Sequence, residues 1–184
     1  MSARDPRVRR TRDRLREALV SLSQEKPYGD IRVADLLARA DVGRATFYAH
    51  YRDKEDLLIS LFLEMIDHFE RIGAAEEPEA VLPGARQLIH HFNEARTFAR
   101  ALARAGKMEV LMRACEARLR RGLEARLPAT CQPPPALVAA VAAGSFTTLV
   151  TAWMTQGYGT SPDDLADALE ALIGPGVRLA RGAA

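Results

Sequence analysis

The sequence predicts an all-α fold in two parts, an N-terminal three-helix head that contains a helix-turn-helix and a C-terminal helical body. Apolar residues recur three and four positions apart along most of the chain, which is the periodicity of helices that bury one face. Glycine and proline clusters separate these stretches and predict the loops between helices. The 184 residues suffice for one or two small domains with a real core.

The stretch from Ile31 to Leu58 predicts the helix-turn-helix. The first helix has four apolar residues on one face: Val33, Leu36, Leu37 and Ala40. A three-residue turn follows, with Val42 as its apolar plug between the helices. The second helix, about 44–51, packs Phe47 and Tyr51 inward, because they lie four positions apart.

The opposite face of this second helix predicts contact with nucleic acid. It offers a guanidinium, a hydroxyl, a phenol and an imidazole but no carboxylate, from Arg44, Thr46, Tyr48 and His50. A helix braced against another across a tight turn is the geometry that enters the major groove of DNA. We therefore expect sequence-specific binding to double-stranded DNA.

The same stretch resembles the TetR family of bacterial transcriptional repressors, TetR/AcrR type. The likeness extends over about 12–61, and beyond that only the architecture is similar. The matching residues are Val33, Asp35, Leu36, Ala40 to Val42, Arg44 to Tyr48, His50, Tyr51, Asp53 to Glu55, Leu57 and Leu58. The resemblance implies a cytoplasmic homodimeric repressor of a palindromic operator, which a small-molecule effector releases. We expect no enzymatic activity and no cofactor.

Residue roles follow from the resemblance and from the chemistry of the side chains. Arg44 is the expected base reader, because a guanidinium pairs bidentately with guanine, and Ala45 is expected to contact a thymine methyl group. The expected phosphate anchors are Thr46, Tyr48, His50 and Lys54. In resembling proteins the position of Lys54 and its backbone amide meet a DNA phosphate. The amide lies at a helix N-terminus, which favours an anion.

Three residues depart from the family pattern. Gly43 stands where the family usually has Ser or Thr at the cap of the second helix, so the DNA-binding site has no hydroxyl there. Asp41 replaces the usual turn glycine, and Asp tolerates a left-handed conformation better than most residues. Leu37 replaces a small residue and should alter the packing between the two helices.

Basic charge is concentrated at the end of the chain that carries this motif. Residues 1–16 hold seven arginines against two aspartates, although the whole chain has a net charge of only +2. Such a cluster of arginines is ordinarily a solvent-exposed helix face without a binding role. Beside the helix-turn-helix we favour phosphate neutralisation, or an arm of about six residues that reaches the minor groove.

We expect a DNA-binding domain over 1–52 and an effector-binding and dimerisation domain over 53–184. A long helix of about 54–73 is shared by both, so displacement of its far end should tilt the head. Two final helices are expected at about 136–156 and 162–173, and 174–176 (Gly-Pro-Gly) should end the regular structure. The first of the two is apolar nearly all round and needs cover on every side. We expect the pair to form a dimer interface; an internal core is the alternative.

The effector pocket is expected within the body. Large adaptable side chains are the candidates to line it, although each is also an ordinary core residue: Met65, Phe69, Phe92, Met108, Met112, Trp153 and Tyr158. No enzyme motif is present, such as a phosphate-binding glycine loop or Gly-x-Ser-x-Gly. A helical ligand-binding protein that has lost DNA binding is the first rival interpretation.

Other chemistries receive less support. A metal site among Glu64, His68, His90 and His91 is conceivable, but adjacent histidines point to different sides of a helix. Cys115 and Cys131 are too few for a disulfide scaffold and are expected to be reduced. The uncharged stretch 136–154 is long enough to span a bilayer, which gives a membrane-associated protein as the second rival. It is rich in Ala and lacks a close basic flank, so we expect no membrane span and, without a signal peptide, a cytoplasmic protein.

Overall fold

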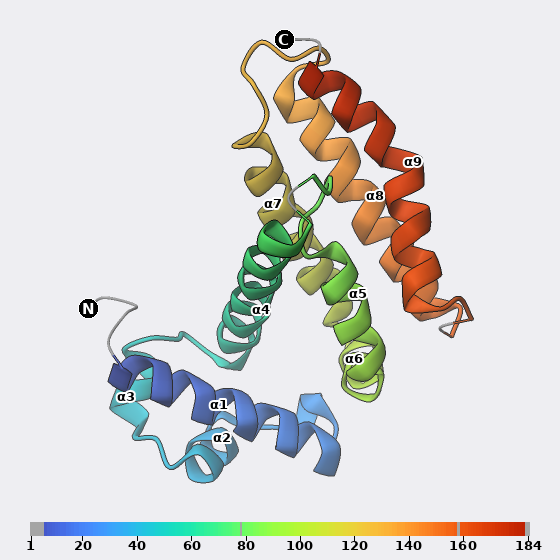
Figure 1. Ribbon diagram of the computed structural model, residues 1–184. Coiled ribbons are helices and arrows are strands. Elements are labelled where there is room, and N and C mark those ends of the chain that lie inside the picture. The colour runs from blue at the N-terminus through green and yellow to red at the C-terminus, as the bar shows by residue number, and fades with distance from the viewer. Residues whose placement is uncertain (1–5, 78, 158, 183–184) are drawn as a thin grey trace. The chain divides into compact units, whose positions relative to one another are not determined.

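The computed structural model describes residues 6–77, 79–157 and 159–182, and the regular structure within them is helical (Figure 1). Nine α-helices and one short 3₁₀ helix, η1, account for the regular structure of these residues, which contain no strand, as the sequence predicts. Their bounds are α1 Pro6–Glu25, η1 Tyr28–Asp30, α2 Val33–Ala40, α3 Arg44–Tyr48, α4 Lys54–Glu76, α5 Ala85–Glu94, α6 Arg96–Arg104, α7 Met108–Glu124, α8 Pro135–Thr155 and α9 Pro162–Gly182.

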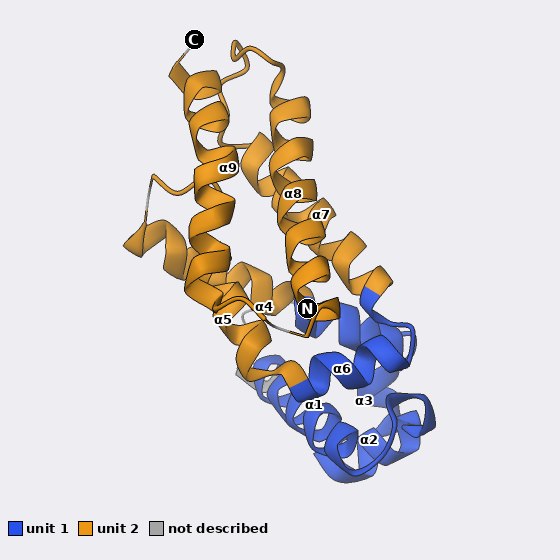
Figure 2. Ribbon diagram, turned by 90° about the vertical axis from the view of Figure 1, so that its right-hand side faces the viewer, with its two compact units in different colours: residues 1–62, 97–108 blue, residues 63–96, 109–184 orange. Residues whose placement is uncertain are grey.

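The chain divides into two compact units (Figure 2). Unit 1 contains the described residues up to Phe62 together with 97–108, and unit 2 contains 63–96 and the described residues from Glu109 onward. The first nine residues of α4 thus belong to unit 1 and the rest of that helix to unit 2. Most of α6 belongs to unit 1, although the sequence suggested no such association.

Unit 1 is built around one apolar cluster. Helices α1 and α2 pack together, and the side chains of α1 that face inward are fully buried, as their 3–4 spacing predicts. The cluster contains Leu15, Ala18, Leu19, Leu22, Tyr28, Ile31, Leu36, Ala40, Phe47, Tyr51, Leu57 and Leu58. Phe47 and Tyr51, the two inward residues predicted for the second helix of the motif, are among them. This core supports α3 from behind, so that α3 can present its other face.

The turn of the helix-turn-helix adopts the predicted backbone. Asp41 ends α2 in the left-handed conformation, with φ 52° and ψ 52°, and is the only described non-glycine residue with positive φ. The amide of Val42 donates to the carbonyl oxygen of Leu37 at 3.1 Å, which completes the C-terminal cap of α2. Val42 itself is half-buried rather than a fully enclosed plug.

Within unit 2, α4 and the segment before α5 meet backbone to backbone. A Cβ atom added to Gly73 would lie 1.8 Å from the amide nitrogen of Gly84. Gly84 has φ +81°, and a Cβ there would lie 2.2 Å from the carbonyl oxygen of Phe69. Only glycines permit this approach. Nearby, Glu70 of α4 forms ion pairs with Arg118 and Arg126, from α7 and the segment after it, at 2.7 and 3.0 Å.

Helices α8 and α9 form a hairpin in unit 2 and lie side by side (Figures 1 and 2). The indole N–H of Trp153 donates to the carbonyl oxygen of Thr160 at 2.8 Å and so fixes the connection between them. Among the described helices, α8 alone is long and apolar enough to cross a membrane, but 44% of its apolar window is buried inside the protein. A core helix of a helical bundle has the same composition.

The end of α9 differs from the sequence expectation. The helix passes through Gly174, Pro175 and Gly176 and ends at Gly182, so the prediction that it stops near 173 is wrong. Proline removes one backbone hydrogen bond, but the apolar face continues beyond it with Val177 and Ala180 buried. Arg178 also pairs with Glu170, two turns earlier on the same helix. Packing on both sides of the proline therefore outweighs its local cost.

Candidate nucleic-acid interface

Helix α3 presents four exposed side chains around a buried anchor. Phe47 is fully buried, whereas the exposed residues are Arg44, Ala45, Thr46 and Tyr48. The Tyr48 ring stands edge-on to Phe47, with ring centroids 5.2 Å apart, and half of its surface remains open. These residues bring together four of the predicted DNA-binding positions, with hydrogen-bond donors and no carboxylate on the exposed face.

Gly43 begins the helix as expected. It has an extended backbone, with φ −67° and ψ 146°, and its carbonyl oxygen accepts a hydrogen bond from the amide of Phe47 at 3.1 Å. A Cβ there would meet nothing closer than the Thr46 hydroxyl at 3.8 Å. The backbone therefore does not require glycine at this position, and a Ser or Thr would fit.

His50 does not lie on α3, because the helix ends at Tyr48 rather than near 51. The amides of His50 and Tyr51 both donate to the carbonyl oxygen of Phe47 at 2.9 Å, which closes a turn. The turn carries Tyr51 into the core and redirects the chain toward α4. His50 is left half-buried beside the Tyr51 ring, so its predicted place on the outer helix face is corrected.

The N-terminus of α4 is capped by Asp53. Its carboxylate oxygen Oδ1 accepts hydrogen bonds from the amides of Glu55 and Asp56, both at 2.8 Å. No described residue accepts a hydrogen bond from the amide of Lys54. That N–H is therefore available to an anion, in the place that the family resemblance implies.

The Lys54 side chain is held inside unit 1. Its ammonium nitrogen lies 2.8, 3.0 and 2.7 Å from the carbonyl oxygens of Tyr28, Gly29 and Ile31, and 4.7 Å from the centroid of the Tyr28 ring. The Tyr28 hydroxyl in turn donates to the carbonyl oxygen of Lys54 at 3.3 Å. Burial, together with the nearby carboxylates of Glu55 and Asp53, raises the pKa of Tyr28 to about 12.

Arginines of α1 extend the positive surface of unit 1. Arg9, Arg10, Arg14 and Arg16 are exposed, in agreement with a helix whose other face is apolar. Arg16 pairs with Asp13 at 3.0 Å, and Arg14 lies 3.8 Å from Asp41 in the turn of the motif. The expected N-terminal arm lies largely outside the described residues.

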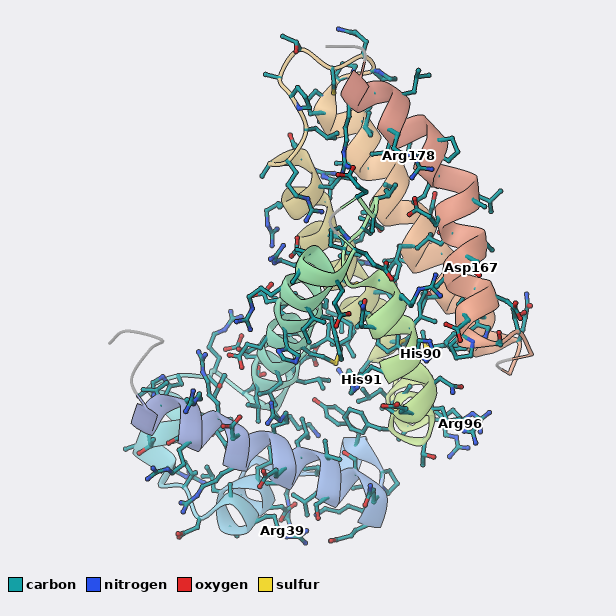
Figure 3. All side chains as sticks on the ribbon, in the orientation of Figure 1. Arg39, His90, His91, Arg96, Asp167 and Arg178 are labelled. Carbon is teal, nitrogen blue, oxygen red and sulfur yellow. The ribbon has the colours of Figure 1, made fainter. Side chains whose placement is uncertain are left out.

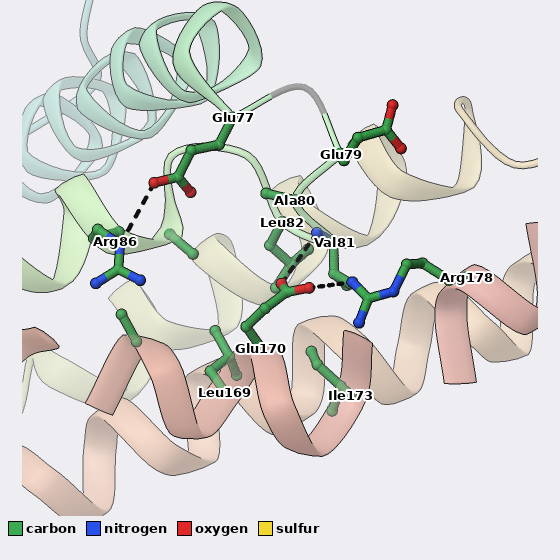
Figure 4. A pocket seen from close by; sticks show the side chains of 12 residues that line it. Glu77, Glu79, Ala80, Val81, Leu82, Arg86, Leu169, Glu170, Ile173 and Arg178 are labelled. Carbon is green, nitrogen blue, oxygen red and sulfur yellow. Dashed lines mark hydrogen bonds and ion pairs between the residues drawn. The ribbon is translucent and has the colours of Figure 1, made fainter. Parts of the chain in front are cut away.

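A cavity of about 290 Å³ lies in unit 2 between the segment after α4, the start of α5 and one side of α9 (Figure 4). Its floor is apolar and its rim carries both signs of charge, with Glu170 bonded to Arg178 and to the amide of Val81. The lining residues are Glu77, Glu79, Ala80, Val81, Leu82, Ala85, Arg86, Ala166, Leu169, Glu170, Ile173 and Arg178. Sequence reasoning missed this site, because its residues come from a loop and two separate helices.

None of the described residues predicted to line an effector pocket borders this cavity. Phe92, Met112 and Trp153 are buried and fill the interior of unit 2, while Met65, Phe69 and Met108 are half-buried. Tyr158, also predicted, lies outside the described residues. The role of these side chains in ligand binding stays a prediction.

The histidines of α5 have separate environments (Figure 3). His90 Nε2 lies 2.9 Å from the Asp163 carboxylate of α9, and hydrogen bonds from His90 and Arg86 lower the pKa of Asp163. His91 is half-buried, with its ring 5.4 Å from that of Phe69, and burial lowers its pKa. Within the described ranges no three His, Cys, Asp or Glu side chains are arranged to hold a metal ion.

The two cysteines are free and buried. Burial raises the pKa of the Cys115 thiol to about 12, so it is protonated and unreactive at neutral pH. The Cys131 thiol donates to the carbonyl oxygen of Pro133 at 3.2 Å. Neither has the exposed, electropositive surroundings of a reactive thiol.

The helix-turn-helix, its exposed helix α3 and the basic surface of α1 define a DNA-binding domain of the helix-turn-helix class. Residues 15–61 match the model of "Bacterial regulatory proteins, tetR family". Over this stretch, about a quarter of its length, the chain is similar to the tetR family of bacterial regulatory proteins.

One relative matches part of the chain. An uncharacterized HTH-type transcriptional regulator, YxbF of Bacillus subtilis (strain 168), is 39% identical over 78 residues. That match covers 40% of this chain and 20% of the relative, so the chain spans about a fifth of the relative's length.

Solved structures share the fold along nearly the whole chain. The dihydroxyacetone kinase operon activator DhaS has a TM-score of 0.64 at 16% identity, with 93% of this chain and 98% of that chain covered. A TetR transcriptional regulator from Streptococcus agalactiae 2603V has a TM-score of 0.59 at 22% identity, with 92% and 96% covered. At these identities the likeness concerns the fold alone.

Proposed function

We propose that this protein regulates transcription as a cytoplasmic homodimeric repressor, which binds a palindromic operator and is released by a small-molecule effector. The observation that carries the proposal is the exposed face of α3. It combines Arg44, Thr46 and Tyr48 on a helix held rigidly from behind by Phe47. A rigid helix with donors and no carboxylate is suited to the acceptor-rich edges and phosphates of the major groove.

Each predicted contact has a distinct part. Arg44 reads a guanine and Ala45 meets a thymine methyl group, while Thr46, Tyr48 and the amide of Lys54 fix the register on phosphates. Gly43 contributes only backbone. His50, half-buried after the end of α3, is the weakest of the proposed contacts. The arginines of α1 add attraction that is independent of sequence.

Dimerisation is supported by the apolar surface of α8 and α9. Six large hydrophobic side chains are exposed among the described residues, and four of them lie on these two helices: Leu137, Val141, Leu172 and Leu179. Their exposed fractions run from 59% to 77%. Large apolar side chains that gather on an exposed surface mark interaction sites of soluble proteins, and a second copy of α8 and α9 offers matching apolar side chains. Two heads related by a two-fold axis would read two half-sites of a palindrome.

An effector would act by binding more tightly to a state of the dimer whose heads no longer match the operator. The cavity beside α9 is one candidate site, close in size to the smaller ligand pockets of proteins. The continuous helix α4 runs from unit 1 into unit 2 and offers a mechanical route between ligand and head.

The test measures the affinity of the protein for two DNA duplexes. One is enriched from a random library, and the other has the same bases in shuffled order. Arg44→Ala should cost about 1–3 kcal/mol on the enriched duplex and relax the preference at one position in each half-site. The shuffled duplex should lose much less, because Arg44 meets a base rather than a phosphate. Equal losses on both duplexes would contradict the base-reading role.

A further inference from the structure

The geometry points to a positioning role for the Lys54 ammonium: we propose that it clips the start of α4 to the turn between α1 and α2 and does not bind a DNA phosphate. The inference deepens the proposed function and rests on it, because it decides which atoms at the start of α4 meet DNA. It also departs from the phosphate anchor that the sequence predicts for this lysine.

All three donors of the ammonium are used within the protein. A protonated lysine has three N–H groups, and three carbonyl oxygens lie within hydrogen-bond distance, those of Tyr28, Gly29 and Ile31. The cation also lies over the face of the Tyr28 ring, which attracts it. The side chain is therefore directed into unit 1 and has no N–H left for a phosphate.

The clip works in both directions between two segments far apart in sequence. The Tyr28 hydroxyl donates back to the carbonyl oxygen of Lys54, and the Tyr28 ring is 1% exposed. An ion pair between Lys26 and Asp35, at 2.6 Å, fixes the same turn to the first residues of α2. The turn that precedes the helix-turn-helix is thus fastened both to α2 and to α4.

Releasing the ammonium to a phosphate would leave the carbonyl oxygens of Gly29 and Ile31 without this donor, whereas that of Tyr28 also accepts from the amide of Ile31 at 3.2 Å. Buried polar groups that lose their partner cost more free energy than the bond itself contributed. Burial and the nearby Lys107 also lower the pKa of Lys54, as expected for a cation withdrawn from solvent. The backbone N–H of Lys54 faces no such cost, because no described residue accepts a hydrogen bond from it.

The clip and the phosphate anchor predict different salt dependence. Each phosphate that a side-chain cation neutralises contributes about 0.9 to the slope of log affinity against log salt concentration. An ammonium that is held within the protein and contacts no phosphate adds little to this slope. An ammonium that binds a phosphate adds about 0.9 to it for each subunit of the dimer. The slope therefore reports where the charge is used, independently of how much affinity is lost.

The experiment compares Lys54→Met with Lys54→Arg, which keeps the charge but cannot direct three donors to three converging carbonyl oxygens. Unfolding temperature and operator affinity at several salt concentrations are measured for both, with wild type alongside. We expect both variants to unfold about 3 °C or more below wild type and to bind more weakly, with the wild-type slope retained. A slope that falls by about 0.9 per subunit in Lys54→Met and returns in Lys54→Arg would overturn the proposal.

A measurement on the wild-type chain decides the matter even if these variants do not fold. The sequence has three lysines, at 26, 54 and 107, so acetylation of each can be followed by mass spectrometry. We expect Lys54 to react slowly in the free protein, and equally slowly with operator DNA bound. Fast reaction in the free protein that operator DNA suppresses would refute the clip. If wild type instead prefers no operator over shuffled DNA, the proposed function fails, while the acetylation of the free protein still tests the clip.

Discussion

Leu172 offers the sharpest test of the proposed dimer. It is 77% exposed on α9, although Leu169 before it and Val177 after it on the same helix are buried. Full burial of a leucine side chain is worth roughly 1.5–3 kcal/mol, so covering the open three-quarters is worth about 1–2 kcal/mol per subunit. A two-fold interface counts the residue twice, which gives about 2–4 kcal/mol per dimer. Because each 1.4 kcal/mol changes a dissociation constant about tenfold, Leu172→Ala should raise the dissociation constant of the dimer roughly 30- to 700-fold.

Sedimentation equilibrium over a wide range of protein concentration measures that constant directly. Val20→Ala is the matched control, because Val20 is also an exposed apolar residue but lies on α1 in unit 1. The control should leave the dissociation constant unchanged, and thermal unfolding should confirm that both variants fold. A Leu172→Ala variant that dimerises as tightly as wild type would refute the placement of α9 in the interface.

Two further predictions concern the body. Burial lowers the pKa of His91, so the neutral form is favoured in the folded state and the unfolded chain binds the proton first. The contribution of His91 to the free energy of unfolding should therefore be complete above about pH 6.5 and be lost as the pH falls from that value through the lower pKa of the folded state. The free energy of unfolding, measured at pH 7.5 and at pH 5.5, gives the size of this loss. If His91→Gln loses as much stability between these two pH values as wild type, His91 is not the cause. Gly73→Ala should cost about 3 kcal/mol or more in denaturant unfolding, since its Cβ would overlap the backbone at Gly84. Gly176→Ala is the control, because a Cβ at that position of α9 would meet nothing within 4 Å, and it should be neutral or stabilising. If Gly73→Ala and Gly176→Ala lost the same free energy of unfolding, the overlap at Gly84 would not be the cause.

Local rules account for most of what the sequence predicted correctly. Helical periodicity predicted the helices of the motif, the long helix α4 and the final pair α8 and α9. The left-handed conformation of Asp41 and the burial of Phe47 and Tyr51 follow from turn chemistry and from spacing. These features depend on neighbours within about four positions, which the sequence displays directly.

The features that the sequence did not predict depend on tertiary contacts. Pro175 is a reliable local stop signal, yet α9 continues through it because residues on both sides are buried. Lys54 has the sequence context of a surface cation at a helix start, and only the fold brings the carbonyl oxygens near Tyr28 to its ammonium. The cavity beside α9 likewise joins segments about 85 positions apart.

Selection from a random duplex library with the purified protein is the measurement to make first, with Tyr48→Ala carried in parallel. Tyr48 is the exposed ring of α3, so its removal should weaken the interface while the Phe47 anchor remains in place. The proposed function predicts a palindromic consensus with half-sites about one helical turn apart, or a multiple of it, which the variant no longer enriches. A pool without enrichment, or the same consensus from the variant, would contradict sequence-specific binding through α3.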